Sequence, residues 1–348
     1  MNHQDHPALS LFSQLLAVPS PSGWETALAA VVRKQVTDLG YDVESDQAGN
    51  LLVRLPGRAA GGPVVCYAAH MDEIAAVVQR IEPDGTLRLI RSGGLFPWKL
   101  GETPLVIMGD ERSIDGVLSM GAGHGAGQRT IEWEDVRVLT GLAPAQLAAA
   151  GVRPGTPVVP SRSICGPIIF GDEADPLVGA WTFDDRMGVV TLLRLLRFLR
   201  ETGEQPMQPA LIAFTVCEEV GGMGAKVLAA RERPDLFIAI DGCPMTPGAP
   251  LELDGRPGIW TTDRLAPYDP RLVQDLCAAA RAAGTELQPV AYDVSASDAS
   301  MVYAAGLAPR AACFGQVRQN SHGFEVARLS VFDNMLHTLV HFVTNWGV

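Results

Sequence analysis

Residues 64–73 read VVCYAAHMDE, an apolar run that stops at His70 and is followed directly by Asp72 and Glu73. A short apolar run of this kind predicts a buried strand. Similar runs recur later in the chain, at residues 210–216, 236–240 and 311–314. Because helical patterns separate these apolar runs, the sequence predicts an α/β fold in which helices cover both faces of a sheet.

The rest of the chain supplies helices and a few further strands for this fold. A length of 348 residues suits two domains and allows a large core beside an internal cleft. Apolar periodicity and the breaks at Gly and Pro predict helices at residues 9–17, 24–39, 187–200, 271–283, 299–304 and 331–344, and strands at 41–43 and 50–54.

The segment from about residue 73 to residue 177 interrupts this alternation. It is rich in Gly and Pro, and one helical pattern at 143–150 stands among short β-type runs at 75–81, 86–90, 105–107 and 156–159. This composition predicts a small, mostly β domain. We therefore expect a discontinuous α/β domain made of residues 1–73 and 178–348, with residues 74–177 inserted as a second domain.

Composition narrows the classes of partner. A formal net charge of −12 argues against nucleic acid and against anionic membrane surfaces. The six cysteines include no CxxC pair, so we expect reduced core cysteines. We find neither a signal peptide pattern nor an apolar stretch of about 18 residues, which a membrane-spanning helix requires. These features together predict a cytoplasmic protein.

Acidic and histidine residues cluster at points where predicted strands end. His70 and Asp72 are two positions apart, so on an extended segment their side chains project to the same side. The carboxylate can then accept a proton from one imidazole nitrogen and leave the other nitrogen for a metal. On its own the pattern also fits a histidine in a turn beside solvated acids.

Two pairs of adjacent acids follow later in the chain. Asp184 and Asp185 stand where a helix begins, and a helix N-terminus needs only one such residue as its cap. Glu218 and Glu219 end the apolar run 210–216, where buried carboxylates are costly unless they are paired or bind a metal. Neighbours on a strand point in opposite directions, so this pair suggests two separate roles.

Asp241 follows the run 236–240, and His322 lies in a loop after 311–314. In open α/β sheets, sites form at the carboxyl ends of the strands, so the five clusters are expected to converge. Several carboxylates and two histidines that converge would repel one another without cations. Nitrogen and oxygen ligands fit zinc, cobalt or manganese, and their number suits two ions about 3.5–4 Å apart that share one carboxylate.

Together, five phrases in this order resemble the tetrahedral glutamyl and deblocking aminopeptidases, which are dinuclear metallopeptidases related to the zinc exopeptidases. The phrases are AHMDE (69–73), FDDRMG (183–188), EEVGGMGA (218–225), AIDG (239–242) and SHG (321–323). Further phrases extend the resemblance over nearly the whole chain, namely PSPSGWE (19–25), DQAGN (46–50) and GVRPGTPVV (151–159). The ordered set is specific, whereas any single phrase is not.

The resemblance implies a zinc-exopeptidase-like mixed sheet and a metal role for five residues. Asp184 would bridge two divalent metal ions. His70 and Asp241 would complete one site, and Glu219 and His322 would complete the other. The expected activity is hydrolysis of the N-terminal residue from short peptides by a water that the two metals activate.

Further implications concern catalysis and assembly. Glu218 would be the general base, Asp72 would orient His70, and the Asp184–Asp185 peptide bond would be cis. The inserted domain would mediate assembly and close the active site from bulk peptides. Relatives form twelve-subunit tetrahedra with interior active sites, although a dimer is also compatible with the sequence.

Three other functions fit the sequence less well. A related amidohydrolase or deacylase would carry its lid domain after the fourth ligand, whereas here a whole domain separates His70 from Asp184. An endoglucanase-like hydrolase needs two carboxylates across a sugar bond, and the metal set leaves no obvious spare pair. A non-catalytic scaffold is disfavoured because all five ligand positions and the base are occupied.

Three positions depart from the family pattern or stay open. His124 lies in a glycine-rich loop that is either flexible or reaches a neighbouring subunit. Asp298 stands where relatives show a Gly-Thr-Asp phrase, so it is a candidate for the substrate pocket. The residues Gln319–Ser321 replace a more usual aromatic/Ile-His phrase. The preferred N-terminal residue is undetermined; an acidic preference would require a basic pocket residue such as Arg310 or Arg318.

Overall fold

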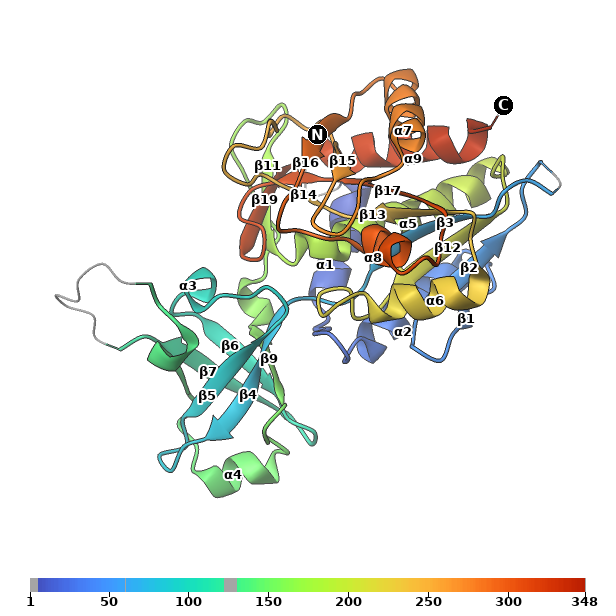
Figure 1. Cartoon of the computed structure of the whole chain (residues 1–348). Helices are drawn as coiled ribbons and strands as arrows, with labels where there is room; N and C mark the ends of the chain where they lie inside the picture. The colour runs from blue at the N-terminus through green and yellow to red at the C-terminus, as the bar shows by residue number, and fades with distance from the viewer. Residues whose placement is uncertain (1–5, 60, 122–129, 348) are drawn as a thin grey trace.

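Four parallel strands form the centre of the larger sheet in this computed structural model, which describes residues 6–59, 61–121 and 130–347. They stand in the order β12 (Ala210–Thr215), β3 (Val65–His70), β13 (Leu236–Ile240) and β17 (Arg310–Gly315). The register places Thr215 beside His70 and Ile240 beside Phe314. The carboxyl ends of all four strands therefore meet along one edge of the sheet (Figure 1).

Further strands extend the sheet on both sides and make it mixed. β2 pairs antiparallel with β12, and β1 continues beyond it. On the other side β15 pairs antiparallel with β17, and β16 pairs parallel with β15. The bounds of these strands are Glu44–Ser45 for β1, Leu51–Leu55 for β2, Gly258–Thr262 for β15 and Gln288–Ala291 for β16.

Helices cover the two faces of the sheet, and alternate residues of β3 point into the two layers. Tyr67 packs with one group of helices and Cys66 with the other. The Tyr67 layer contains α1 (Pro7–Leu16), α2 (Thr26–Asp38), α5 (Phe183–Thr202), α7 (Pro270–Ala282) and α9 (Val331–Asn345). The Cys66 layer contains α6 (Met223–Glu232) and α8 (Asp298–Ala304). Among the described helices, none is long and apolar enough to cross a bilayer.

The predicted α/β sheet covered by helices is confirmed, with local differences. All six cysteines are free thiols. The predicted strand at 41–43 is wrong, because the ring of Tyr41 packs under Arg200, its hydroxyl donates to the Leu196 carbonyl, and no sheet ladder forms there. Helix α6 was not predicted; it lacks an apolar stripe, since small residues supply most of its buried face.

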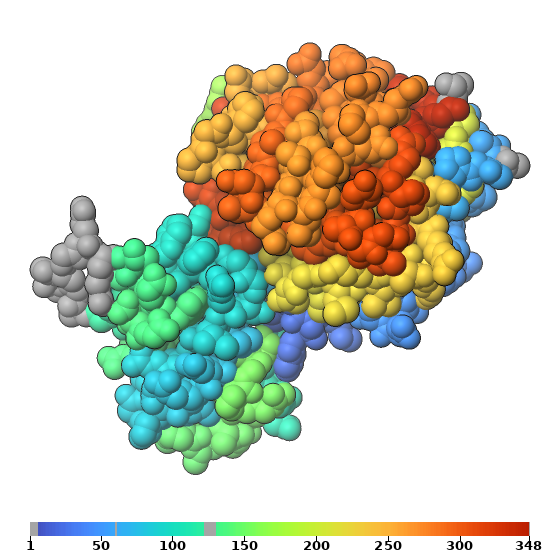
Figure 2. All heavy atoms as spheres, viewed as in Figure 1, coloured from blue at the N-terminus to red at the C-terminus, as the bar shows by residue number. Residues whose placement is uncertain are grey.

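A closed barrel projects from the larger unit, and its strands lie within the predicted insertion 74–177 (Figures 1 and 2). Around the barrel the strands are β4 (Ala75–Ile81), β5 (Leu87–Ser92), β8 (Arg137–Leu139), β7 (Ser113–Ser119), β6 (Pro104–Met108) and β9 (Pro157–Pro160). Two short helices, α3 (Pro97–Leu100) and α4 (Pro144–Ala149), pack against them. The sequence did not predict β7, because Asp115 and Gly116 interrupt its apolar residues; in the barrel its side chains alternate between exposed and buried.

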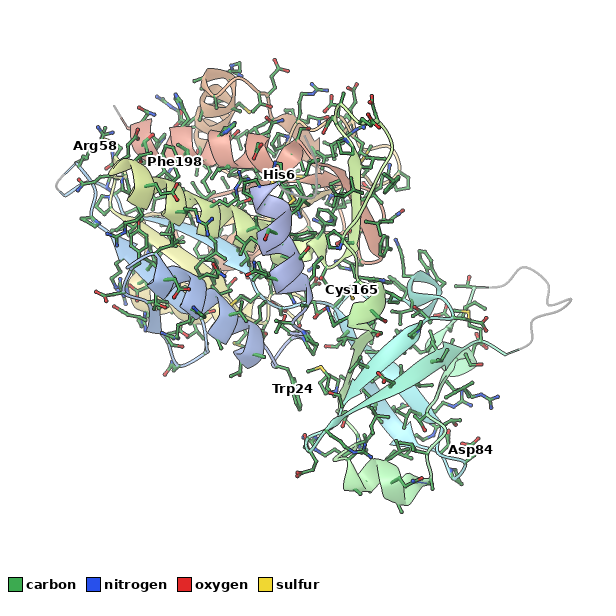
Figure 3. All side chains as sticks on the ribbon, turned by 180° about the vertical axis from the view of Figure 1, so that it is seen from behind. His6, Trp24, Arg58, Asp84, Cys165 and Phe198 are labelled. Atoms are coloured by element: carbon green, nitrogen blue, oxygen red, sulfur yellow. The ribbon has the colours of Figure 1, made fainter. Side chains whose placement is uncertain are left out.

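Two small sheets accompany the barrel and the larger sheet, and the first of them links the inserted segment to the larger unit. In one, β11 (Leu177–Trp181) pairs with both β10 (Ile168–Phe170) and β19 (Phe324–Arg328). In the other, β14 (Cys243–Pro244) pairs with β18 (Val317–Arg318). Cys165 lies where the two units meet, whereas Asp84 lies in the barrel, away from the larger unit (Figure 3).

A buried ionic network fixes the two stems of the barrel to the larger unit. Glu73 stands just before β4, and Arg162 stands just after β9. Arg162 donates to both carboxylate oxygens of Glu73 at 3.1 Å, and Arg186 of α5 lies 3.4 Å from the same carboxylate. Glu73 and Arg186 are fully buried, so their charges depend on each other.

Replacing Glu73 with Gln should therefore destabilise the protein, because the Arg186 guanidinium would stay buried without its counter-charge. We expect the free energy of unfolding to fall by about 3–5 kcal/mol, measured by urea denaturation. As a control, Glu82→Gln removes a partly exposed carboxylate that pairs with Arg80 and Arg88 in the barrel, and it should lower the free energy of unfolding only slightly, because solvent screens such pairs. Equal unfolding midpoints for both variants and the unaltered protein would show that the network is not needed.

Candidate metal centre

The imidazole of His70 lies at the end of β3, between two acidic residues. Its Nδ1 is 3.1 Å from the carbonyl oxygen of Asp72 and 3.5 Å from the Oδ1 of the same residue. Its Nε2 is 3.1 Å from Oδ1 of Asp184. Nδ1 is thus engaged by Asp72, which leaves Nε2 directed toward Asp184 and the interior of the site.

The two acids at the start of α5 have different surroundings. Asp185 accepts a hydrogen bond from the Gly188 amide at 3.0 Å and so caps the helix. The backbone amide of Asp184 donates to Glu325 at 3.0 Å, while its carboxylate faces His70. The peptide bond between the two residues is cis, as the resemblance implied. Because Asp185 serves as the cap, the carboxylate of Asp184 is available for chemistry.

The turn after β12 is held by carboxylates from two other segments. Cys217 has a φ of +56°, and its amide donates to Glu25 at 3.0 Å. The next two amides, of Glu218 and Glu219, donate to the two carboxylate oxygens of Asp72 at 2.9 and 3.1 Å. Asp72 therefore positions the backbone of both glutamates in addition to facing His70.

Asp241 and His322 complete the cluster. The Asp241 amide donates to the Phe314 carbonyl at 3.1 Å, so its side chain leaves β13 at the same edge as His70. His322 is in a loop after β18; its Nε2 lies 3.5 Å from Oδ2 of Asp184 and 3.6 Å from Oε2 of Glu219. The structure thus brings together all seven residues that the sequence singled out.

Three sets of possible ligand atoms can be drawn within this cluster, each with its atoms within 4.8 Å of one another. The sets are His70, Asp184 and Asp241; Asp184, Glu219 and His322; and His70, Glu218 and Glu219. Asp184 belongs to the first two sets. A carboxylate shared between two donor sets is the arrangement that a bridging ligand of two cations requires.

Burial makes this group of acids difficult to ionise. It raises the pKa of Glu218 well above its usual range, helped by the nearby charge of Asp241. It also raises the pKa of Glu219 to about 8 and that of Asp241 to about 7, in both cases aided by the charge of Asp184. The acids would therefore hold protons at neutral pH unless another positive charge replaced them.

Asp184 and His322 behave in the opposite way. Burial acts to raise the pKa of Asp184, but the Arg318 guanidinium and the two histidines outweigh it and hold that pKa well below its usual range. Burial acts to lower the pKa of His322, but the charges of Glu219 and Asp184 outweigh it and raise that pKa to about 10. Asp184 is thus the acid that stays ionised.

The residues present fit divalent cations. Their donor atoms are carboxylate oxygens and imidazole nitrogens, which suit zinc, cobalt and manganese. Oε1 of Glu219 is buried without a hydrogen-bond partner, which costs free energy unless a cation satisfies it. A cation between these groups would also remove the need for the acids to bind protons.

The sequence did not predict a contact between Arg318 and the centre. Its guanidinium is 2% exposed, contacts Oδ2 of Asp184 and lies 2.7 Å from Oε1 of Glu325. The signal that was available is its position after the apolar strand β17, at the same sheet edge as the ligands. Arg310 instead pairs with Asp269 at 2.5 Å and does not line the cleft into which Asp184 and the two glutamates open.

Asp298, the candidate for the substrate pocket, lies close to this cluster, where its charge helps to raise the pKa of Glu218. The residue is buried, its Oδ2 accepts a hydrogen bond from Thr215 at 2.6 Å, and it is not among the residues that line the cleft. His124 lies outside the described residues.

This cleft has a volume of about 890 Å³ between the barrel and the larger unit, and its lining includes Asp184, Glu218, Glu219, Asp241 and His322. Phe96, Trp98 and Lys99 line it from the barrel side, and Val294 and Met301 line it from the other side. Figure 2 shows the teal residues of the barrel directly against the orange and red residues of the C-terminal half. Both units therefore contribute to the walls.

These pKa values predict how the stability of the metal-free protein depends on pH. The folded protein holds the Glu219 proton up to about pH 8, whereas an unfolded glutamate releases it near its model value of 4.5. This proton therefore stabilises the folded state fully below pH 4.5, and the stabilisation is lost as the pH rises from 4.5 to about 8.

Glu219→Gln should consequently make the fall in Tm between pH 5 and pH 8.5 shallower in chelator-treated protein, measured by circular dichroism. The matched control is Glu204→Gln, which replaces an exposed glutamate and should keep the original slope. Identical slopes for the two variants would contradict a buried, protonated Glu219.

Comparison with known proteins agrees with this geometry. The M42 glutamyl aminopeptidase family model matches residues 49–337. The glutamyl aminopeptidase of Lactococcus lactis is 30% identical over 75% of this chain and 74% of its own length.

Solved structures share the fold. An aminopeptidase from the archaeon Desulfurococcus kamchatkensis superposes with a TM-score of 0.86 at 25% identity, over 97% of this chain and 94% of that one. The TET1 peptidase of Pyrococcus horikoshii, which can assemble into a tetrahedron or a large octahedral shell, gives 0.85 at 24% identity over 97% and 99%. By the extent of the family match and the likeness to the curated enzyme, the chain belongs to the M42 glutamyl aminopeptidase family.

Proposed function

We propose that this aminopeptidase removes N-terminal residues from short peptides with two divalent metal ions, zinc, cobalt or manganese. The observation that carries the proposal is the sharing of Asp184 by two donor sets, one with His70 and Asp241 and the other with Glu219 and His322. Four ligands around one common carboxylate suit a pair of cations better than a single one.

Glu218 is proposed as the general base. When bound, the two ions would supply a water of lowered pKa and polarise the scissile carbonyl. Glu218 lines the cleft, and the hydrogen bond from its amide to Asp72 fixes its backbone beside His70. Its carboxylate takes the proton of the attacking water and later gives it to the leaving amine, as the C–N bond breaks.

Asp72 is proposed to act by positioning. Its carboxylate accepts hydrogen bonds from Ser22 at 2.7 Å and from the amides of Glu218 and Glu219. It also lies beside Nδ1 of His70. One buried carboxylate therefore sets the orientation of a metal ligand together with the backbone of the base.

We propose residues 1–73 and 178–348 as the catalytic domain and residues 74–177 as an oligomerisation and lid domain. The barrel supports this division because it has its own apolar core and forms one wall of the cleft. A homo-oligomer, between a dimer and a tetrahedral dodecamer, is proposed by analogy with the TET1 peptidase. Such an assembly would restrict substrates to short peptides.

Of the two competing activities, a glycosidase needs chemistry that the site does not favour, whereas a deacylase has to be separated by experiment. A glycosidase requires two carboxylates that face each other across a sugar bond. Among the described residues, the carboxylates that line this cleft are Asp184, Glu218, Glu219 and Asp241, of which Glu218 is the proposed base and the other three are proposed metal ligands. A deacylase would use the same centre, so hydrolysis of unblocked aminoacyl-anilides against N-acylated substrates separates it from an aminopeptidase.

Glu218→Gln should remove the base while it keeps the size of the side chain and leaves the proposed ligands in place. We expect kcat to fall by about 10²–10⁴-fold on aminoacyl-anilides, with metal content unchanged by elemental analysis. Glu204→Gln, at an exposed position, serves as the control and should keep full activity. Normal peptidase activity of Glu218→Gln would overturn the assignment of the base.

Removal and replacement of metal test the centre itself. Dialysis against a chelator should abolish peptidase activity, and zinc, cobalt or manganese added singly should restore it to different extents. Asp184→Asn should lower the metal content, because it removes the charge of the shared ligand. Peptide hydrolysis that persists in protein shown to be free of metal would refute the two-metal proposal.

A further inference from the structure

The two nitrogens of His322 face two different domains of the protein. Nε2 is directed at Asp184 and Glu219, at 3.5 and 3.6 Å. Nδ1 lies 3.1 Å from the carbonyl oxygen of Gly94. An Nδ1–H that donates to this carbonyl leaves the lone pair on Nε2, which is the form of histidine that a metal needs.

Gly94 belongs to the inserted barrel. It lies in a segment of residues 93–99, here called the clamp segment, which runs from the end of β5 into α3. Leu95, next to Gly94, is 1% exposed and packs in the core of the barrel with Leu100. Figure 1 shows α3 on the side of the barrel that faces the larger unit. The barrel therefore supplies the carbonyl that faces Nδ1 of His322 as a hydrogen-bond acceptor.

The fit between the clamp segment and the centre is close enough to require glycine. A Cβ atom on Gly94 would lie 2.3 Å from Nδ1 of His322, a distance that no real contact allows. A Cβ on Gly93 would lie 3.3 Å from Cβ of Glu219, which is also tighter than usual. The clamp segment thus touches both residues that form a donor set with Asp184.

Lys99, at the other end of the clamp segment, contacts the loop that carries His322. Its Nζ donates to the Ser321 carbonyl at 3.0 Å, and a Cβ on Gly323 would lie 3.2 Å from its Cδ. The loop needs such support, because Asn320 and His322 both have a φ of +60°, which is uncommon for residues other than glycine.

The larger unit holds the backbone of this loop and faces the ring of His322 only at Nε2. Glu325 accepts a hydrogen bond from the His322 amide at 3.3 Å, and it also pairs with Arg318. The hydrogen bond that selects the ring orientation of His322 comes from Gly94. By contrast, the Nδ1 of His70 is oriented by Asp72 of the larger unit.

We propose that the clamp segment is a positioning element that completes the donor set of Asp184, Glu219 and His322, so that one of the two metal sites depends on the docked barrel. This inference rests on the proposed two-metal function. The site of His70 and Asp241 is built by the larger unit alone. The two sites should therefore respond differently to changes in the barrel.

The experiment is a titration of the metal-free full-length protein with zinc alone, by calorimetry and by elemental analysis after dialysis. Gly94→Ala should displace the His322 ring, and Lys99→Met should release the loop without adding bulk. In both variants we expect one of two zinc equivalents to bind about 10–100-fold more weakly, while the other keeps its affinity. His322→Ala marks which equivalent is affected.

Two further variants separate positioning from a general loss of structure. Lys99→Arg keeps a donor for the Ser321 carbonyl, so it should bind both zinc equivalents with the affinities of the unaltered protein. Lys34→Met removes an exposed lysine on α2 that pairs with Asp38 and should bind zinc like the unaltered protein. Lys99→Met keeps the test decisive if Gly94→Ala folds poorly, as judged by circular dichroism.

The outcomes distinguish this inference from the function on which it rests. Unaltered protein that binds two zinc ions, with Gly94→Ala and Lys99→Met that bind both equally well, would overturn the role of the clamp segment only. Equal weakening of both equivalents would also overturn it, because the effect would not be confined to one site. Unaltered protein that binds fewer than two ions would overturn the two-metal proposal and this inference with it.

Discussion

The repulsion among buried carboxylates is the constraint on which the rest of the structure depends. Four parallel strands end at one edge of the sheet and bring Glu218, Glu219 and Asp241 close to Asp184, in a place from which water is largely excluded. Such a cluster is tolerated only if positive charge compensates it or protons occupy it. Arg318 and the histidines supply part of that charge, and divalent cations would supply the remainder.

Much of the fold could be predicted from the sequence, because buried strands and amphipathic helices leave local periodic patterns. The runs that became β3, β12 and β13 were recognised within one or two residues of their ends. The failures occurred where tertiary contacts override the local pattern. Strand β7 carries Asp115 and Gly116, and α6 buries mainly small residues, so neither showed a clear apolar period.

The candidate site divides in the same way. Its acids could be found because they stand directly after strands or at the start of a helix, with His70 ending a strand and His322 in a following loop, and a family resemblance then suggested roles for them. Contacts across domains left no such trace. Glu73 meets Arg162, and His322 meets Gly94, across long stretches of sequence. Nothing local distinguishes Gly94 from the many glycines that only shape turns.

Closure of the barrel has a consequence for how copies of this protein can meet. β4 pairs with both β5 and β9, and the ring of six strands leaves no open ladder edge among them. A neighbouring chain therefore cannot add a strand to it, so recognition through this domain has to rely on side-chain shape and polarity. Val117 and Leu139, cross-strand neighbours that are both more than 40% exposed, give that surface an apolar centre.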